Sequence, residues 1–107
     1  MVIRRFGIYL VALDPVRGAE TSKTRPCVII SPDDLNRVLS TVIIAPMTTV
    51  RRNWPTRPEI EFQGKCGEVA LDQLRAVDKT RLVKKLGDIP EHIERTILDT
   101  LAELFAE

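Results

Sequence analysis

The sequence predicts a mainly β protein that ends in one α-helix. Short β-branched and apolar runs recur through the first 87 positions, and turn-forming residues separate them. From residue 89 to residue 105 the apolar residues change to a spacing of about 3.6, which is typical of an amphipathic helix. With 107 residues and 44% hydrophobic content, the chain is expected to form a single domain, residues 1–107, around one core.

The first two predicted strands flank a charged loop. Residues 8–13 are almost continuously apolar, as expected for a strand covered on both faces, and Asp14-Pro15 ends the run. Residues 16–24 carry several charges and no hydrophobic period, which indicates a loop long enough to act as a flap. Residues 25–31 form the second strand, which is expected to run antiparallel to the first.

A short helix and a third strand follow. Ser31 is expected to cap a helix of one or two turns, which ends by Ser40. Residues 41–47 are β-branched and apolar, so they predict the third strand. This strand delivers Thr48 and Thr49 to its far end.

The next segments predict shorter strands. Residues 59–62 alternate polar and apolar side chains, and residues 63–67 are predicted to form the turn of a hairpin. Residues 68–71 indicate a strand that continues through 72–78, where polar residues occupy alternate positions. The last strand is predicted at 82–86, with a turn at the glycine that follows it.

The terminal segment predicts a helix that packs on the open side of the sheet. Pro90 suits the first turn, because its missing N–H is not needed there. The apolar stripe consists of Ile93, Ile97, Leu98, Leu101 and Leu104 or Phe105.

The net charge does not assign a partner, but its distribution is uneven. The chain holds 16 basic and 15 acidic side chains. The first 87 residues have a net charge of +6, whereas residues 88–107 have a net charge of −5. This polarity is compatible with steering a polyanion to one face, and equally with an acidic surface helix.

The sequence predicts no metal site, cofactor, disulfide or membrane segment. Cys27 and Cys66 have neither C-x-x-C spacing nor a companion histidine. No run approaches the roughly 18 apolar residues that span a membrane. The short apolar run after Arg4-Arg5 lacks a small-residue cleavage site, so a cytoplasmic protein is expected.

Several blocks of residues together carry a family resemblance. They are the first strand with Asp14-Pro15, Gly18-x-Glu20, Lys23-x-Arg25-Pro26, Ala45-Pro46-Met47-Thr48-Thr49, Asp72-Gln73-Leu74-Arg75-x-x-Asp78, and the terminal helix. In this order the blocks resemble the MazF/PemK toxins, which are metal-independent endoribonucleases of type II toxin–antitoxin modules. One departure is Phe6-Gly7, where that family usually has Gly-Asp.

The resemblance implies a fold and partners. The fold is a small SH3-like barrel (CcdB/PemK-like) with a C-terminal α-helix, and the assembly is a homodimer. The substrate is single-stranded RNA, and a cognate MazE-like antitoxin neutralises the toxin. This antitoxin is expected to lay an acidic, initially disordered segment along the groove between residues 16–24 and 50–58.

The resemblance also implies the catalytic residues. Arg25 and Thr48 match the family's cleavage residues, and the neighbouring Thr49 is an alternative to Thr48. Glu20 is implicated either in catalysis or in holding the flap, and as a surface acid it could equally pair with Lys23.

Basic and aromatic residues near these positions are candidate RNA contacts. Residues 50–58 form a basic loop in which arginines could neutralise phosphates and Trp54 could stack on a base. Trp54 could equally fold back over the end of the barrel. The candidate RNA-binding residues are Arg17, Lys23, Thr49, Arg51, Arg52, Trp54, Arg57 and Gln73.

The available residue types restrict the chemistry. His92 is the only histidine, which excludes a two-histidine acid–base mechanism, and no carboxylates are spaced for two-metal catalysis. Arg25 offers a fork of donors to phosphate oxygens, and Thr48 adds a hydroxyl donor. Because arginine normally stays protonated, Glu20, a backbone group and the substrate itself all remain open as participants in proton transfer. The family leaves a 2′,3′-cyclic phosphate and a 5′-hydroxyl.

Two alternative functions fit the same fold. The CcdB branch poisons DNA gyrase without cleaving anything and uses a C-terminal Trp-Gly-Ile, whereas this chain ends Leu104-Phe105-Ala106-Glu107. The other alternative is a catalytically inactive barrel that binds RNA or a protein.

Overall fold

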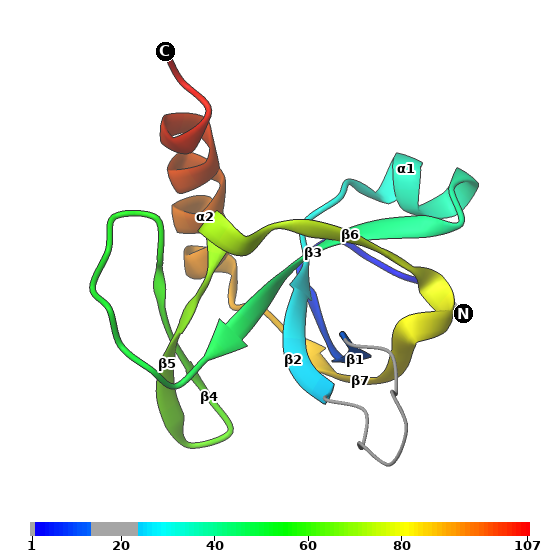
Figure 1. The fold of residues 1–107 in the computed structure, drawn as a ribbon, viewed down its shortest axis with the longest axis horizontal. Coiled ribbons are helices and arrows are strands. Elements are labelled where there is room, and N and C mark those ends of the chain that lie inside the picture. Colours follow the sequence, from blue (N-terminus) through cyan, green and yellow to red (C-terminus); the bar gives the residue numbers. More distant parts are fainter. Residues whose placement is uncertain (1, 14–23) are drawn as a thin grey trace, which may run out of the picture.

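The computed structural model describes residues 2–13 and 24–107 and consists of a curled antiparallel sheet with a helix against it (Figure 1). The strands are β1 (Gly7–Ala12), β2 (Thr24–Ile29), β3 (Thr41–Thr48), β4 (Glu59–Phe62), β5 (Lys65–Val69), β6 (Arg75–Asp78) and β7 (Leu82–Asp88). The helices are α1 (Asp33–Val38) and α2 (Glu91–Leu104), with short 3-10 helices η1 (Leu71–Gln73) and η2 (Lys79–Arg81). None of the described helices has the length and apolar character needed to cross a membrane.

The sheet has the order β4-β5-β3-β2-β1-β7, and β6 also pairs with β3. The mainly β prediction with a terminal helix is therefore confirmed, as is the antiparallel pairing of the first two strands. The sheet curls until its two ends, β4 and β7, approach each other. A Cβ atom at Gly87 would lie only 3.3 Å from the Phe62 ring, so this side-chain contact joins the two end strands.

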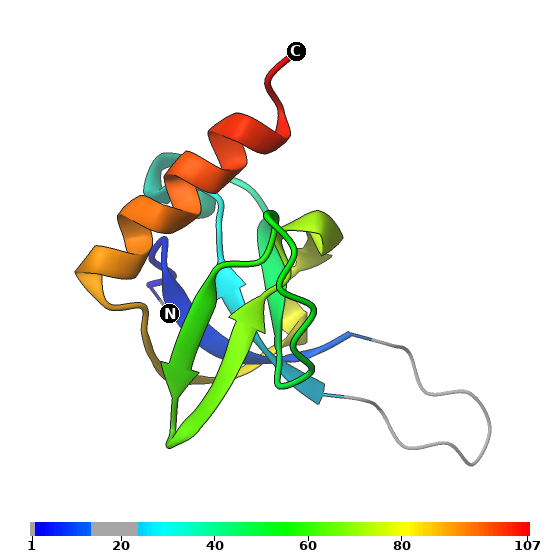
Figure 2. The same cartoon turned by 90° about the vertical axis from the view of Figure 1, so that its left-hand side faces the viewer.

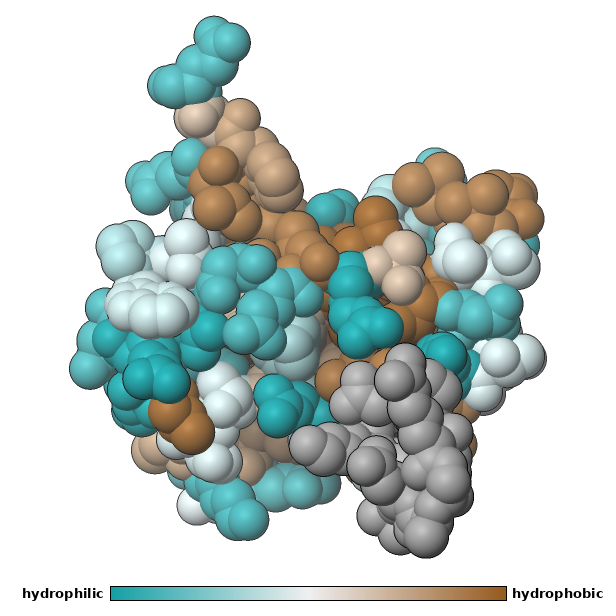
Figure 3. Space-filling model, in the orientation of Figure 1, coloured by the Kyte–Doolittle hydropathy of each residue, from teal (hydrophilic) through white to brown (hydrophobic). Residues whose placement is uncertain are grey.

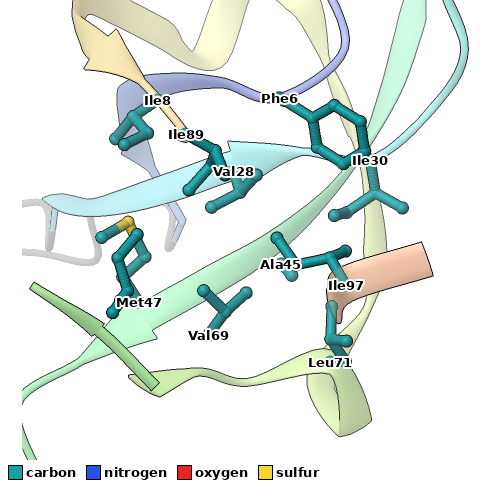
Figure 4. Packing of buried hydrophobic residues seen from close by; sticks show 11 residues of the cluster. Phe6, Ile8, Val28, Ile30, Ala45, Met47, Val69, Leu71, Ile89 and Ile97 are labelled. Atoms are coloured by element: carbon teal, nitrogen blue, oxygen red, sulfur yellow. The ribbon is translucent and has the colours of Figure 1, made fainter. Parts of the chain in front are cut away.

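Apolar residues cover both faces of the central strands, which explains their continuous apolar sequence. In β2, Val28 belongs to the cluster under α2, whereas Cys27 and Ile29 point into a second cluster on the opposite face. Tyr9 and Val11 of β1 extend this second cluster. The alternation follows from the two-residue period of a strand. Figure 4 shows the cluster under α2, in which side chains from several strands converge.

Helix α2 lies obliquely against the sheet and covers the first cluster (Figure 2). Ile97 is completely buried, and Ile93, Leu98 and Leu101 pack around it, as the predicted stripe requires. Phe105 follows the last helical residue and is 72% exposed, so it does not belong to the buried stripe.

The predicted continuous strand at residues 68–78 is wrong, because η1 interrupts it. The N–H of Ala70 donates to the Pro46 carbonyl at 2.9 Å, and the N–H of Gln73 donates to the Ala70 carbonyl at 3.0 Å. Leu71 is buried between these bonds in the cluster under α2. The chain therefore makes a tight turn beside β3 before it pairs with the same strand again as β6.

Two predicted turns also differ. The hairpin between β4 and β5 turns only at Gln63 and Gly64, whose φ angles of 53° and 75° suit a two-residue turn that keeps the strands twisted together. Gly87 lies inside β7 and opposite Ile8, so it is not a turn residue.

The predicted cap of the short helix is wrong. Pro32 occupies the N-cap position of α1 and makes no side-chain capping bond. The Ser31 hydroxyl instead donates to Oδ1 of Asn36 at 2.6 Å and accepts the N–H of Ile43 at 3.0 Å. Both Ser31 and Asn36 are buried, so this polar pair fixes α1 to the start of β3.

The structure explains how Phe6-Gly7 can replace the Gly-Asp that the resembled family usually has before the first strand. Its φ angle is 69°, a left-handed conformation that glycine adopts easily and other residues adopt at a cost of about 1–2 kcal/mol. The family's glycine falls at this position. In this chain the Phe6 side chain is buried in the cluster under α2, and burying a phenylalanine contributes about 1.5–3 kcal/mol. The apolar contact thus offsets the backbone cost.

Candidate functional site

A cavity of about 420 Å³ opens where the start of β2, the end of β3 and the β4–β5 hairpin meet. Its more buried side is apolar and includes Met47 and Ile60. Its rim carries the exposed polar residues Arg25, Thr49 and Gln63. The cavity therefore combines an apolar interior with hydrogen-bond donors at the mouth.

Arg25 and Thr48 line the same cavity at one end of the sheet. The paired residues of antiparallel β2 and β3 end with Cys27 opposite Pro46, and Arg25 and Thr48 each lie two residues beyond this last pair. Two side chains that are 23 positions apart in the sequence thus border one cavity.

Arg25 and Thr48 both retain hydrogen-bonding capacity. Within the described residues, no carboxylate pairs with the Arg25 guanidinium. Oγ1 of Thr48 accepts the N–H of Val50 at 3.1 Å, which holds the hydroxyl oxygen and leaves its proton available to a ligand. The pair can therefore direct donors at an anion in the cavity.

Cys27 lies two positions after Arg25 in the sequence but is not reactive. Burial raises the pKa of the Cys27 thiol to about 12, although the charges of Arg25 and Arg75 act in the opposite direction. A thiol with this pKa is neutral at pH 7 and is a poor nucleophile.

Strand β5 fits closely against the end of β3 because residue 67 is a glycine. A Cβ atom at Gly67 would lie 2.3 Å from the Thr48 carbonyl oxygen, which no side chain could tolerate without movement. The next residue, Glu68, is paired directly with Thr48 in the sheet. The placement of Thr48 therefore depends on β5 as well as on β2.

The loop at residues 50–58 is held by the buried carboxylate of Glu68. This side chain is 0% exposed, and it accepts the N–H of Arg52 at 3.0 Å and the N–H of Asn53 at 2.9 Å. Nε of Arg51 lies 3.4 Å from the same carboxylate. These bonds, the Arg52 N–H first, hold the pKa of Glu68 below its ordinary value in spite of burial.

Carboxylates neutralise two of the loop arginines. Arg51 pairs with Glu59 as well as Glu68. Arg57 is buried and donates to both carboxylate oxygens of Asp72, at 3.0 and 3.2 Å, and this bond lowers the pKa of Asp72. The loop is therefore less available to phosphates than its composition suggests, and the roles of Arg51 and Arg57 in RNA binding stay predictions.

Trp54 lies in the middle of the loop and is 49% exposed. The guanidinium carbon of Arg57 is 4.6 Å from its ring centroid, and that of Arg52 is 5.8 Å away. The arginines hold the indole by cation–π contact. About half of its surface remains accessible to a ligand.

The remaining predicted site residues fall in three places. Thr49 is on the cavity rim, whereas Gln73 is exposed in η1 and does not line the cavity. Arg17, Glu20 and Lys23 lie outside the described residues. His92 is exposed near the start of α2, on a different hollow from the one that contains Arg25.

Sequence reasoning missed several residues of this site. Phe62, Gln63 and Lys65 of the hairpin line the cavity, although the sequence indicated only a strand and a turn there. Glu68 was also missed. The sequence pattern that could have pointed to it is an acidic residue at the start of the apolar run that ends at Leu71. Among residues 2–13 and 24–107, no group of three or more metal-ligating side chains is found.

Replacing Glu68 by glutamine is expected to lower the thermal midpoint, and the loss should depend on pH. Because folding depresses the pKa of Glu68, its ionised form stabilises the folded state above the unfolded pKa, and this contribution disappears as the pH falls through the folded pKa. Thermal melts of the parent and Glu68→Gln should therefore differ most near pH 7 and converge below about pH 4. The control is Glu61→Gln, an exposed change in the same hairpin; a Glu68→Gln difference that is constant with pH would contradict the assignment.

Comparisons with known proteins agree with this architecture. Residues 4–105 match the family described as PemK-like, MazF-like toxin of type II toxin–antitoxin system. The endoribonuclease MazF of Staphylococcus epidermidis is 40% identical over 96 residues, which cover 84% of this chain and 80% of that protein.

Solved structures share the fold. An endoribonuclease in complex with its cognate antitoxin, from Mycobacterial species, superposes with a TM-score of 0.80 at 25% identity, covering 94% of this chain and 92% of that chain. The MazE–MazF structure (Form-II) from Deinococcus radiodurans gives a TM-score of 0.83 at 23% identity over 97% and 96% of the two chains, a likeness of fold. The extent of the sequence match decides the family: this chain belongs to the PemK-like, MazF-like toxins of type II toxin–antitoxin systems.

Proposed function

We propose that this chain is a sequence-specific, metal-independent endoribonuclease that cleaves single-stranded RNA. The observation that carries the proposal is that Arg25 and Thr48, from the ends of two neighbouring strands, line one cavity. The relative at 40% identity has the same activity in its name. RNA as the substrate implies action in the cytoplasm.

Arg25 supplies charge stabilisation. Its planar guanidinium can bind two nonbridging phosphate oxygens at once, and the negative charge on these oxygens increases as the 2′-oxygen attacks phosphorus. The hydroxyl of Thr48 adds a donor on the facing strand, held in place by the Val50 N–H. Donors fixed before the reaction need no reorganisation in the transition state.

The reaction forms one bond to phosphorus and breaks another. The 2′-hydroxyl loses its proton and its oxygen bonds to phosphorus, while the bond from phosphorus to the 5′-oxygen breaks and that oxygen takes up a proton. The products are a 2′,3′-cyclic phosphate and a 5′-hydroxyl. No carboxylate or imidazole is among the described residues that line the cavity. The candidates for proton transfer are therefore Glu20, which lies outside the described residues, a backbone group and the substrate itself.

The gyrase-poison alternative has no support in the site. Gyrase poisoning requires no cavity lined by hydrogen-bond donors. In addition, the family that matches residues 4–105 is that of PemK and MazF. The same donors argue against an inactive binding barrel, because binding alone does not require both Arg25 and Thr48 at one cavity.

Replacing Arg25 or Thr48 by alanine should reduce RNA cleavage by about 10²–10³-fold without unfolding the protein, because each change removes one preorganised donor. Cleavage of an unstructured RNA is measured by gel in the presence of a metal chelator, and folding is checked by circular dichroism. Arg95→Ala and Thr96→Ala, on the exposed side of α2, are matched controls. Parental rates for both site variants would refute the assignment.

A cognate antitoxin is proposed to bind the surface that is also proposed to bind RNA. It would do so with an acidic segment that folds on binding. A surface that accepts a phosphate backbone also suits Asp and Glu side chains. In the described part of the loop, Arg52 is the arginine that has no carboxylate partner through its side chain, whereas Arg51 and Arg57 do. Arg52 is therefore the strongest candidate for direct contact with either ligand.

Arg52→Glu should weaken the binding of both RNA and an acidic antitoxin peptide, and added salt should weaken binding of each to the parent. Arg25→Ala should greatly reduce cleavage but leave most of the peptide affinity. Calorimetric titration measures the affinities for RNA and for the peptide. Lys84→Glu on β7 is the charge-matched control. Unchanged peptide affinity in Arg52→Glu would place the antitoxin on another surface.

A homodimer is proposed because apolar side chains remain exposed around α1. Val38 is 75% exposed, and Leu35, Leu39 and Ile43 are exposed beside it. Figure 3 shows these hydrophobic side chains at the upper right, where α1 lies in Figure 1. Two copies of one surface can pack around a two-fold axis.

Light scattering at micromolar concentration should give twice the 12.1 kDa mass of one chain. Val38→Asp should shift the mass toward that of a single chain, because it introduces a charge into the contact. Val83→Asp on β7 is the control, since Val83 is also exposed but lies on another element. A single-chain mass for the parent would exclude the dimer.

A further inference from the structure

The apolar side of the cavity beside Arg25 and Thr48 has no role in the chemistry described above. We propose that it binds one unpaired base of the RNA, in a nucleotide next to the cleaved phosphate, and that Gln63 reads the edge of this base. The inference rests on the proposed endoribonuclease function and adds the residues that would set its sequence preference.

The composition of the cavity matches the parts of a nucleotide. Met47 and Ile60 are only 8% and 6% exposed and form its apolar side together with the half-buried Phe62. A phosphate is not stabilised by such a surface, whereas the flat face of a base can stack on an aromatic side chain. The volume of about 420 Å³ accommodates a base together with part of its ribose.

Phe62 is held as a rigid wall of this cavity. Its ring packs against the core cluster under α2 and touches the backbone of β7 where Gly87 has no side chain, at 3.3 Å from the position of a Cβ. The ring, which belongs to end strand β4, is thus packed against the core and against the other end strand, β7, before any ligand binds. A preorganised aromatic face is a stacking platform that loses little conformational freedom on binding.

Gln63 stands at the rim, directly after Phe62. Its φ angle of 53° places it at the first position of the tight hairpin turn, so its backbone is fixed by the pairing of β4 with β5. The side-chain amide carries both a donor and an acceptor, which can pair with two neighbouring groups on a base edge. Stacking alone accepts any base, so this amide would discriminate between the bases.

Two basic residues line the cavity together with its apolar side chains. Arg25 comes from the start of β2, and Lys65 comes from the start of β5. Each base in RNA is flanked by two phosphates, so a base in this cavity has a cation available for each of them. Among the described lining residues there is no carboxylate that would repel either phosphate.

The test compares base preference with affinity. Each variant is incubated with an RNA pool that contains a randomised unstructured segment, and the 5′ ends of the products are sequenced. Gln63→Ala should lose about tenfold or more of the discrimination at one position that flanks the cut and keep the parental preference elsewhere. Phe62→Leu, which retains apolar volume without a stacking face, should raise KM about tenfold with little change in kcat.

Matched controls separate these effects from damage to the hairpin. Glu61→Ala lies in the same hairpin, next to Phe62, and faces a different hollow from the one that contains Arg25. Phe105→Leu makes the same chemical change at an exposed phenylalanine. Both controls should retain the parental base preference and KM. Parental preference and KM in both Gln63→Ala and Phe62→Leu would overturn the base site.

Binding without cleavage distinguishes this inference from the proposed function. The probe is a 2′-O-methyl RNA, which has no free 2′-hydroxyl to attack phosphorus, and its affinity is measured by fluorescence anisotropy. If the parent cleaves no RNA, the endoribonuclease function fails, and the base site is then decided by this affinity alone. Phe62→Leu should weaken it about tenfold relative to Phe105→Leu, and equal affinities would refute the site.

Discussion

Strand β3 has hydrogen-bonded partners along both edges, and the position of every described part of the site depends on this pairing. Its first half pairs with β6, its end pairs with β5, and β2 runs along its other edge. The register with β2 sets Cys27 opposite Pro46, two residues before Arg25 and Thr48 at the cavity, and the register with β5 sets Glu68 opposite Thr48. A shift of one residue would turn each of these side chains to the opposite face. The positions of the site residues are therefore fixed by the register of the sheet.

Buried polar contacts then fix the loop that leaves β3. Glu68 receives two backbone N–H groups from that loop, and Asp72 receives the guanidinium of Arg57. A buried carboxylate without such donors would cost several kcal/mol, so these interactions specify one loop conformation rather than add much net stability. These contacts also use the positive charges of Arg51 and Arg57, so that Arg52 is the arginine of this loop without a carboxylate partner.

Much of the fold could be predicted from local pattern. The two-residue period of the strands and the 3.6-residue period of α2 depend on neighbouring positions, so the strands and the stripe around Ile97 were placed correctly. The interruption at η1 could not be predicted, because residues 68–78 alternate like a strand and the turn is decided by the bond from Ala70 to Pro46. Ser31 was misassigned for the same reason, since its partner Ile43 is 12 residues away.

The fold class, the family and the catalytic candidates Arg25 and Thr48 could be read from residue types in a fixed order along the chain. Which charges remain available for a ligand depends on contacts between segments that are distant in the sequence. Arg51, Arg52 and Arg57 look equivalent in the sequence, yet Arg51 and Arg57 are paired with carboxylates that lie 8 to 17 positions further along the chain. The tertiary structure also decided that Phe62 and Gln63 face Arg25, because the sheet must curl before strands distant in the sequence can enclose one cavity.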